Sequence, residues 1–172
     1  LSVSSASAAT AKVDAVVIGV ARGPKGLVLA PGADSIATAL GKGLLPALVG
    51  LGATGKAEEI TRLATLGATT AAVVVAVGLG APPAKGAAYD PELLRRASGA
   101  AVRALAGSGK VAVTLAASGG DVAVAARAVG EGSLLGAYAF VAASPEATQV
   151  MVAANELRVG EPIVASDLRV AD

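Results

Sequence analysis

The stretch that decides the fold is VVVAVGLG at residues 73–80, followed by DPELLRRASGAAVRAL at residues 90–105 and KVAVTLA at residues 110–116. The first and last runs are short, apolar and rich in β-branched residues, which is typical of buried strands. The middle segment begins with Asp-Pro-Glu, a typical helix start, and its Leu and Ala residues recur at helical spacing. A strand, a helix and a second strand in this order predict a parallel pair of strands with a helix packed on the sheet.

The same alternation continues toward the N-terminus. The run VDAVVIGV at residues 13–20 predicts another buried strand, which ends at a Gly-Pro turn at residues 23–24. Residues 26–30 and 59–66 predict two shorter strands. Between them, residues 34–51 predict a helical region that Asp34 or Ser35 can cap, although its glycines and proline leave the geometry open.

A second helix is predicted toward the C-terminus, where Asp121 can cap residues 122–140. This segment is apolar nearly all round, and a helix of that kind is buried on more than one side. We therefore expect a further domain or a partner to pack over it, with an Ala-rich surface helix as the alternative.

Composition limits the chemistry that this chain can perform. The 172 residues include no His and no Cys, the side chains most used as general base, soft metal ligand or activated nucleophile. The carboxylates are scattered, and the neighbouring Glu58 and Glu59 cannot converge on one point in a helix or a strand. We therefore expect no catalytic residue, no metal site and no bound cofactor in this chain.

Charge and hydropathy exclude two classes of partner. The net charge is +1, no block of like charges exists and aromatic residues make up 2%, which argues against nucleic-acid binding. The uncharged residues 63–84 are long enough to span a bilayer, but Thr, Gly and Pro interrupt them. A buried strand explains them better, and residues 1–12 do not form a convincing signal peptide. We expect no membrane segment.

Two glycine turns are the candidate ligand-binding positions. Gly78 and Gly80 directly follow a predicted strand, and Gly119 and Gly120 precede the second helix. Open α/β sheets bind ligands beyond the carboxyl ends of their strands. However, Pro83 stands where a dinucleotide-binding loop has its third Gly, so a tight turn at residues 78–80 is the favoured interpretation.

The element order, with VGLG at residues 77–80 and GEGSLLGAYAF at residues 130–140, resembles the N-terminal domain of the leucyl aminopeptidase (cytosol aminopeptidase) family, above all its actinobacterial members. The resemblance covers about residues 2–143. It implies a macro-domain-like, three-layer α/β/α domain at residues 1–143, with a mixed, mostly parallel sheet.

The resemblance also implies partners and location. In the family a separate catalytic domain holds two zinc or manganese ions on Lys, Asp and Glu ligands, whose motifs are absent from this sequence. The N-terminal domain contributes to hexamer assembly and to access to the active sites. The implied partners are thus a catalytic domain or identical subunits, in the bacterial cytoplasm.

The C-terminal stretch QVMVAANELRVGEPIVASDLRVAD at residues 149–172 departs from the family. It resembles the opening of SAF-type modules, with two short strands around a Gly-Glu-Pro turn at residues 160–162. We expect residues 144–172 to form a linker and a short β-hairpin-like tail, with the boundary at residues 144–145.

Three hypotheses on function follow. The leading one is a non-catalytic N-terminal domain of a leucyl-aminopeptidase-like metallopeptidase, acting in oligomer assembly or in regulation of peptide hydrolysis. The second is a macro-domain-like module that binds a nucleotide or an ADP-ribose derivative at the glycine turns. The third is a structural interaction protein that uses the apolar helix at residues 122–140.

Overall fold

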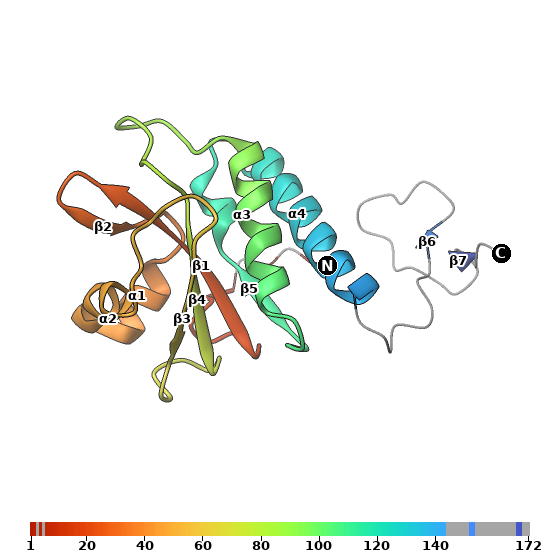
Figure 1. Cartoon of the computed structure of the whole chain (residues 1–172), viewed down its shortest axis with the longest axis horizontal. Helices are drawn as coiled ribbons and strands as arrows, with labels where there is room; N and C mark the ends of the chain where they lie inside the picture. The colour runs from red at the N-terminus through yellow and green to blue at the C-terminus, as the bar shows by residue number, and fades with distance from the viewer. Residues whose placement is uncertain (3, 5, 144–151, 154–167, 170–172) are drawn as a thin grey trace.

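The computed structural model describes residues 1–2, 4, 6–143, 152–153 and 168–169. Figure 1 shows a sheet with helices on opposite sides, α1 and α2 on one and α3 and α4 on the other. The strands are β1 (Ala15–Gly23), β2 (Gly26–Leu29), β3 (Ile60–Ala64), β4 (Val73–Gly78) and β5 (Val111–Val113). The helices are α1 (Asp34–Leu40), α2 (Leu44–Gly50), α3 (Pro91–Ala104) and α4 (Val122–Ala143), with 3-10 turns η1 (Gly41–Gly43) and η2 (Leu115–Ser118).

Strand β1 is the centre of the sheet. It pairs in parallel with β4 along one edge, and its other edge is shared by β5, in parallel, and β2, in antiparallel orientation. Strand β3 pairs antiparallel with β4. The α/β class and the mixed sheet are confirmed, but the expectation of a mostly parallel sheet is wrong, because two of these four pairings are antiparallel.

The strand predicted at residues 110–116 is shorter than expected. Only Val111–Val113 pairs with β1, and the chain then enters η2. The reason is tertiary, because β2 already occupies the same edge of β1 from Val20 onward. At this point Thr114 donates both its N–H and its hydroxyl to the carbonyl of Val17, and the chain leaves the sheet.

The core lies on both faces of the sheet. In β1, Val17 and Ala21 belong to the cluster beneath α3 and α4, whereas Val16, Ile18 and Val20 belong to the cluster beneath α1 and α2. Side chains that alternate along a strand thus feed two separate clusters. This arrangement explains the continuous apolar run, since both faces of β1 exclude water.

The helix starts agree only in part with the sequence prediction. Asp90 caps α3, and Asp121 caps α4 by accepting the N–H groups of Ala123 and Val124 at 2.8 and 3.1 Å. The predicted cap of α1 by Asp34 or Ser35 is wrong. Helix α1 begins directly after Ala33, and no side chain caps it.

Residues 63–84 contribute to β3 and β4, as the strand interpretation predicted. None of the described helices combines the length and the apolar character needed to cross a bilayer. In the C-terminal region β6 (Val152–Ala153) pairs antiparallel with β7 (Leu168–Arg169), as expected of a hairpin. The predicted boundary at residues 144–145 and the turn at residues 160–162 lie outside the described residues.

Candidate functional site on helices α3 and α4

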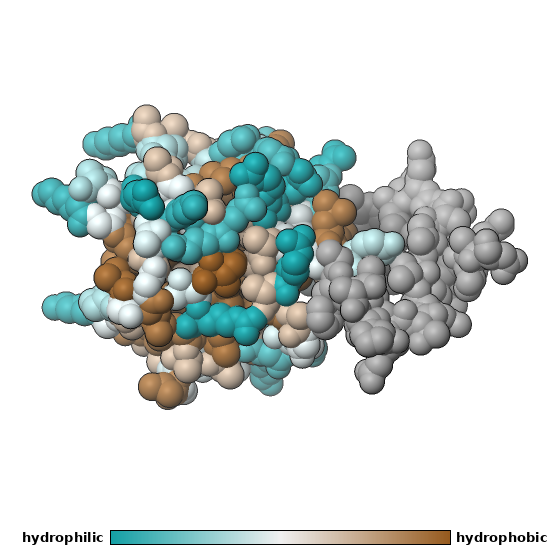
Figure 2. Space-filling model, viewed as in Figure 1, coloured by the Kyte–Doolittle hydropathy of each residue, from teal (hydrophilic) through white to brown (hydrophobic). Residues whose placement is uncertain are grey.

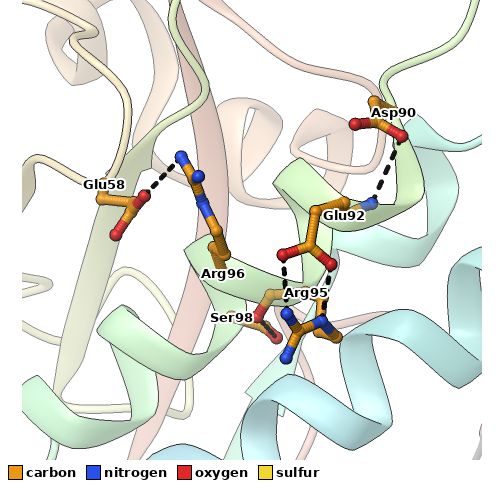
Figure 3. A network of polar contacts seen from close by, with 6 residues as sticks. All are labelled: Glu58, Asp90, Glu92, Arg95, Arg96 and Ser98. Carbon is orange, nitrogen blue, oxygen red and sulfur yellow. Dashed lines mark hydrogen bonds and ion pairs between the residues drawn. The ribbon is translucent and has the colours of Figure 1, made fainter.

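Ion pairs fix the beginning of α3 and tie it to the rest of the domain. The Arg95 guanidinium donates to both carboxylate oxygens of Glu92, at 2.7 and 2.6 Å, as Figure 3 shows. This hydrogen bond lowers the pKa of Glu92 below its ordinary value. Arg96, on the next position of the helix, pairs with Glu58 at 2.7 Å and so connects α3 to the loop before β3.

Helices α3 and α4 approach each other at a contact of small residues. The hydroxyl of the fully buried Ser98 lies 3.0 Å from the carbonyl oxygens of Arg95, on its own helix, and Val129, on α4. A Cβ on Gly99 would lie 3.0 Å from the carbonyl oxygen of Gly132. A Cβ on Gly136 would lie 3.0 Å from the Cα of Gly99. The two backbones therefore pack without intervening side chains, and α4 is held rigidly on α3.

A flank of α4 beside the glycine contact carries what we call the α4 stripe, and part of the stripe also lines the grooves between α4 and α3. Its apolar members are Val124, Leu134, Leu135 and Tyr138, which are 49%, 57%, 54% and 55% exposed. Between them lies a single ion pair, from Arg127 Nε to a carboxylate oxygen of Glu131 at 2.8 Å. The α4 stripe consists of these six residues. The prediction that a further domain or a partner packs over this helix stays a prediction.

Two shallow grooves run between α3 and α4. The larger, about 380 Å³, is lined by charged and apolar residues from the start of both helices, and the smaller, about 170 Å³, lies over the glycine contact. Figure 2 shows hydrophilic residues gathered over this part of the molecule, with apolar patches between them. The larger groove is lined by Asp90, Pro91, Glu92, Arg95, Val124, Arg127, Ala128 and Glu131.

The first predicted glycine turn is occupied by the chain itself. The N–H of Gly78 donates to the carbonyl of Glu59 at 2.8 Å, and that of Gly80 donates to the carbonyl of Gly55 at 2.9 Å. The carbonyl of Gly80 accepts from Arg22 at 2.8 Å. The amide groups that a phosphate would need thus hold the loop before β3 in place, which agrees with the tight-turn interpretation.

The carboxylate of Glu59 organises that same loop. It accepts the N–H groups of Thr54 and Gly55 at 2.7 and 2.8 Å and the hydroxyl of Thr54. Burial raises the pKa of Glu59, but the hydrogen bonds from Thr54, Gly55 and Lys56 outweigh burial and lower it below the ordinary value. The Glu59 carboxylate therefore fixes the backbone of residues 54 and 55 in the loop before β3.

The second predicted turn lies beside η2. The N–H of Gly119 donates to the carbonyl of Ala116 at 3.3 Å, and Gly120 is exposed next to Ala88. The binding role predicted for the four glycines stays a prediction.

The described residues offer no cluster for a metal ion, since no three Asp or Glu side chains among them gather closely enough to hold one. What the structure presents instead is an exposed surface of mixed character on a rigid helix pair. Sequence reasoning named the helix at residues 122–140 as a possible interface, but it missed the charged pair on this surface and the glycine contact beside it. The available signal was the pair Gly132 and Gly136, four residues apart on one helix, since small residues at that spacing let two helices approach closely.

Comparison with known proteins defines the class to which this fold belongs. A model of the N-terminal domain of the cytosol aminopeptidase family matches residues 17–143. The chain therefore belongs to the cytosol aminopeptidase family, and the resemblance predicted from the sequence is confirmed.

Curated relatives come from actinobacteria. The chain is 53% identical over 110 residues to a probable cytosol aminopeptidase of Streptomyces griseus, with 64% of this chain and 21% of the relative covered. It is 51% identical over 112 residues to that of Streptomyces coelicolor, with 65% and 22% covered. For Rhodococcus jostii the identity is 40% over 103 residues, with 60% and 20% covered. The chain thus spans about a fifth of the length of these relatives.

Among solved structures, the bottromycin maturation enzyme BotP is 26% identical, with a TM-score of 0.48. The match covers 72% of this chain and 23% of that enzyme. The family assignment stands on the sequence matches.

Proposed function

We propose that this chain is a non-catalytic assembly domain of a cytoplasmic cytosol aminopeptidase. In this proposal peptide hydrolysis, with its two zinc or manganese ions, belongs to a catalytic domain of the kind that the family name implies. The domain described above serves to assemble identical subunits into an oligomer such as a hexamer, or to seat the catalytic domain, and thereby to regulate access of peptides to it.

The observation that carries this proposal is the α4 stripe. Three large apolar side chains, Leu134, Leu135 and Tyr138, lie within little more than one helical turn, and each is more than half exposed. Single exposed apolar residues are ordinary on a protein surface, whereas a cluster of them marks a contact surface. The stripe also lies on a helix that backbone packing holds against α3, so a partner would meet a preorganised surface.

The first test is enzymatic. The purified chain, supplied with zinc or manganese, is expected to release no p-nitroaniline from leucine p-nitroanilide. Clear turnover that survives further purification would refute a non-catalytic role.

The second test is a chimera in which residues 17–143 replace the matching region of the Streptomyces griseus relative. We expect it to keep the relative's assembled mass in light scattering. Replacing Leu134, Leu135 and Tyr138 together by Ser should lower the assembled fraction. The matched control is Leu51→Ser, because Leu51 is 55% exposed but lies at the end of α2. Unchanged assembly of the triple variant would contradict the proposal.

Calorimetry separates this proposal from the ligand-binding alternative. Because the N–H groups of Gly78 and Gly80 already donate within the chain, we expect no heat of binding when ADP-ribose is titrated into the protein. Saturable heat that is lost in a Gly120→Trp variant would favour a macro-domain-like binding module instead.

A further inference from the structure

The order of side chains along the α4 stripe carries information beyond its apolar character. Its residues recur at intervals of three and four, so they lie on one line along the helix. Val124 comes first, Arg127 and Glu131 follow, and the Leu pair and Tyr138 complete the line. The stripe thus places an ion pair of opposite charges between two apolar ends.

The central part of this order is symmetric when the helix is reversed, whereas Leu135 and Tyr138 extend one end only, since the matching positions 123 and 120 are Ala and Gly. Arg127 and Glu131 are each two residues from Val129, and Val124 and Leu134 are each five residues from it. A second α4 that runs in the opposite direction and crosses at the level of Val129 therefore presents opposite charge to charge and apolar to apolar. A two-fold symmetric interface requires self-complementarity of this kind, because the same patch must match itself.

We propose that α4 pairs antiparallel with α4 of a second copy of this chain, through the α4 stripe. This inference rests on the proposed assembly function and names the partner and register of the same surface. In the pair, Arg127 lies opposite the partner's Glu131, and Glu131 lies opposite the partner's Arg127. Val124 packs against the partner's Leu134 and Leu135, once at each end of the crossing.

The ion pairs and the apolar contacts have different roles in this arrangement. Within one chain the Arg127–Glu131 pair is exposed, with 81% of the Arg127 side chain accessible, so it adds little to the stability of the fold. Between two copies the same charges select the antiparallel register, because a shift or a parallel arrangement brings like charges together. The affinity comes from the apolar residues at both ends, whose exposed surface is removed from water.

Other exposed apolar residues of the described chain lack this symmetry. Leu66, at 95% exposed, stands in the uncharged turn between β3 and β4, and Val49 and Leu51 lie at the end of α2. Neither location has a central pair of opposite charges flanked by apolar groups. The reversible order of charges favours a second copy over an unrelated partner, since an unrelated partner places no such constraint on this surface.

The test uses charge reversal in the full chain, with the dimer measured by sedimentation equilibrium and by native mass spectrometry. We expect the wild type to dimerise with increasing concentration. Arg127→Glu alone and Glu131→Arg alone should each weaken the dimer at least tenfold, because like charges then face each other twice. The double variant R127E/E131R should dimerise like the wild type, since the charges are exchanged but still matched.

The decisive arm mixes the two single variants. In a mixed dimer the glutamate introduced at position 127 of one variant meets the arginine introduced at position 131 of the other. The native Glu131 of the first variant meets the native Arg127 of the second, so both contacts are attractive. The mixture should therefore form heterodimers while each variant alone stays mostly monomeric. The control Arg62→Glu carries the same charge change on the exposed side of β3 and should leave dimerisation unchanged.

Each possible outcome decides the proposal. A wild type that stays monomeric up to millimolar concentration, or a dimer that ignores all α4 charge reversals, overturns the pairing. Neither outcome contradicts the proposed assembly function, because the chimera tests that function separately. If assembly of the chimera depends on the α4 stripe while the isolated chain stays monomeric, then the stripe packs against a different surface of the aminopeptidase and not against a second α4.

Discussion

The close contact between α3 and α4 makes a quantitative prediction for Gly132→Ala. A Cβ at this position would stand 2.8 Å from the carbonyl carbon of Arg95, and it would overlap the carbonyl oxygen and the Ser98 hydroxyl. Ordinary contact between carbon atoms begins at about 3.5 Å, so the two helices must separate locally by at least about 0.7 Å. The hydrogen bond from Ser98 to the carbonyl of Val129 stretches with them.

The expected cost follows from opposing terms. Overpacking of this kind costs about 1–3 kcal/mol, and a lost hydrogen bond to a buried hydroxyl costs about 1 kcal/mol more. Because Ala has a better helix propensity than Gly, the substitution also regains about 1 kcal/mol of this cost. We therefore expect Gly132→Ala to lower the free energy of unfolding by about 2 kcal/mol, measured by urea denaturation, and Tm by about 4–8 °C.

The matched control is Gly50→Ala, which also places a Cβ on a helix. No atom lies within 4 Å of the position of that Cβ, so this variant should be as stable as the wild type or more stable by up to about 1 kcal/mol. A Gly132→Ala protein with wild-type stability would show that the two helices are not in backbone contact and that α4 is not held rigidly on α3.

Three further predictions concern local features. Leu66 adopts a left-handed backbone conformation with φ +50° and is 95% exposed. Leu66→Gly should relieve this strain and raise the free energy of unfolding in urea by up to about 1 kcal/mol. A lower free energy of unfolding would contradict the assigned conformation. The pKa of Glu59 is lowered in the fold, so its stabilising contribution is fully present above the ordinary value of 4.5 and is lost as pH falls through the lower folded value. Glu59→Gln should accordingly flatten the fall in stability between about pH 5 and pH 3, and parallel curves for both proteins would rule out this role. Asp121→Ala should lower the free energy of unfolding by about 1 kcal/mol, because the α4 cap is lost, whereas Asp121→Asn should keep most of the wild-type stability. Thermal unfolding measures both, and a Tm of Asp121→Ala equal to that of the wild type would contradict the cap.

The sequence by itself determined the elements whose signals are local. The β-branched runs specify β1 and β4, because a continuous apolar strand can be stable only with both faces covered. The Asp-Pro-Glu start and the helical spacing of apolar residues specify α3. The family followed from the same elements and from the segments at their ends.

Tertiary structure decided what depends on contacts between distant segments. Strand β5 ends early because β2 competes for the same edge of β1, and no pattern within residues 110–116 encodes that competition. Likewise, the loop before β3 takes the amide groups of Gly78 and Gly80, which the sequence left free for a ligand. The outward face of α4 follows from the fit of Gly132 against α3, because the small residues at positions 132 and 136 indicate a close helix contact but do not say which segment of the chain makes it.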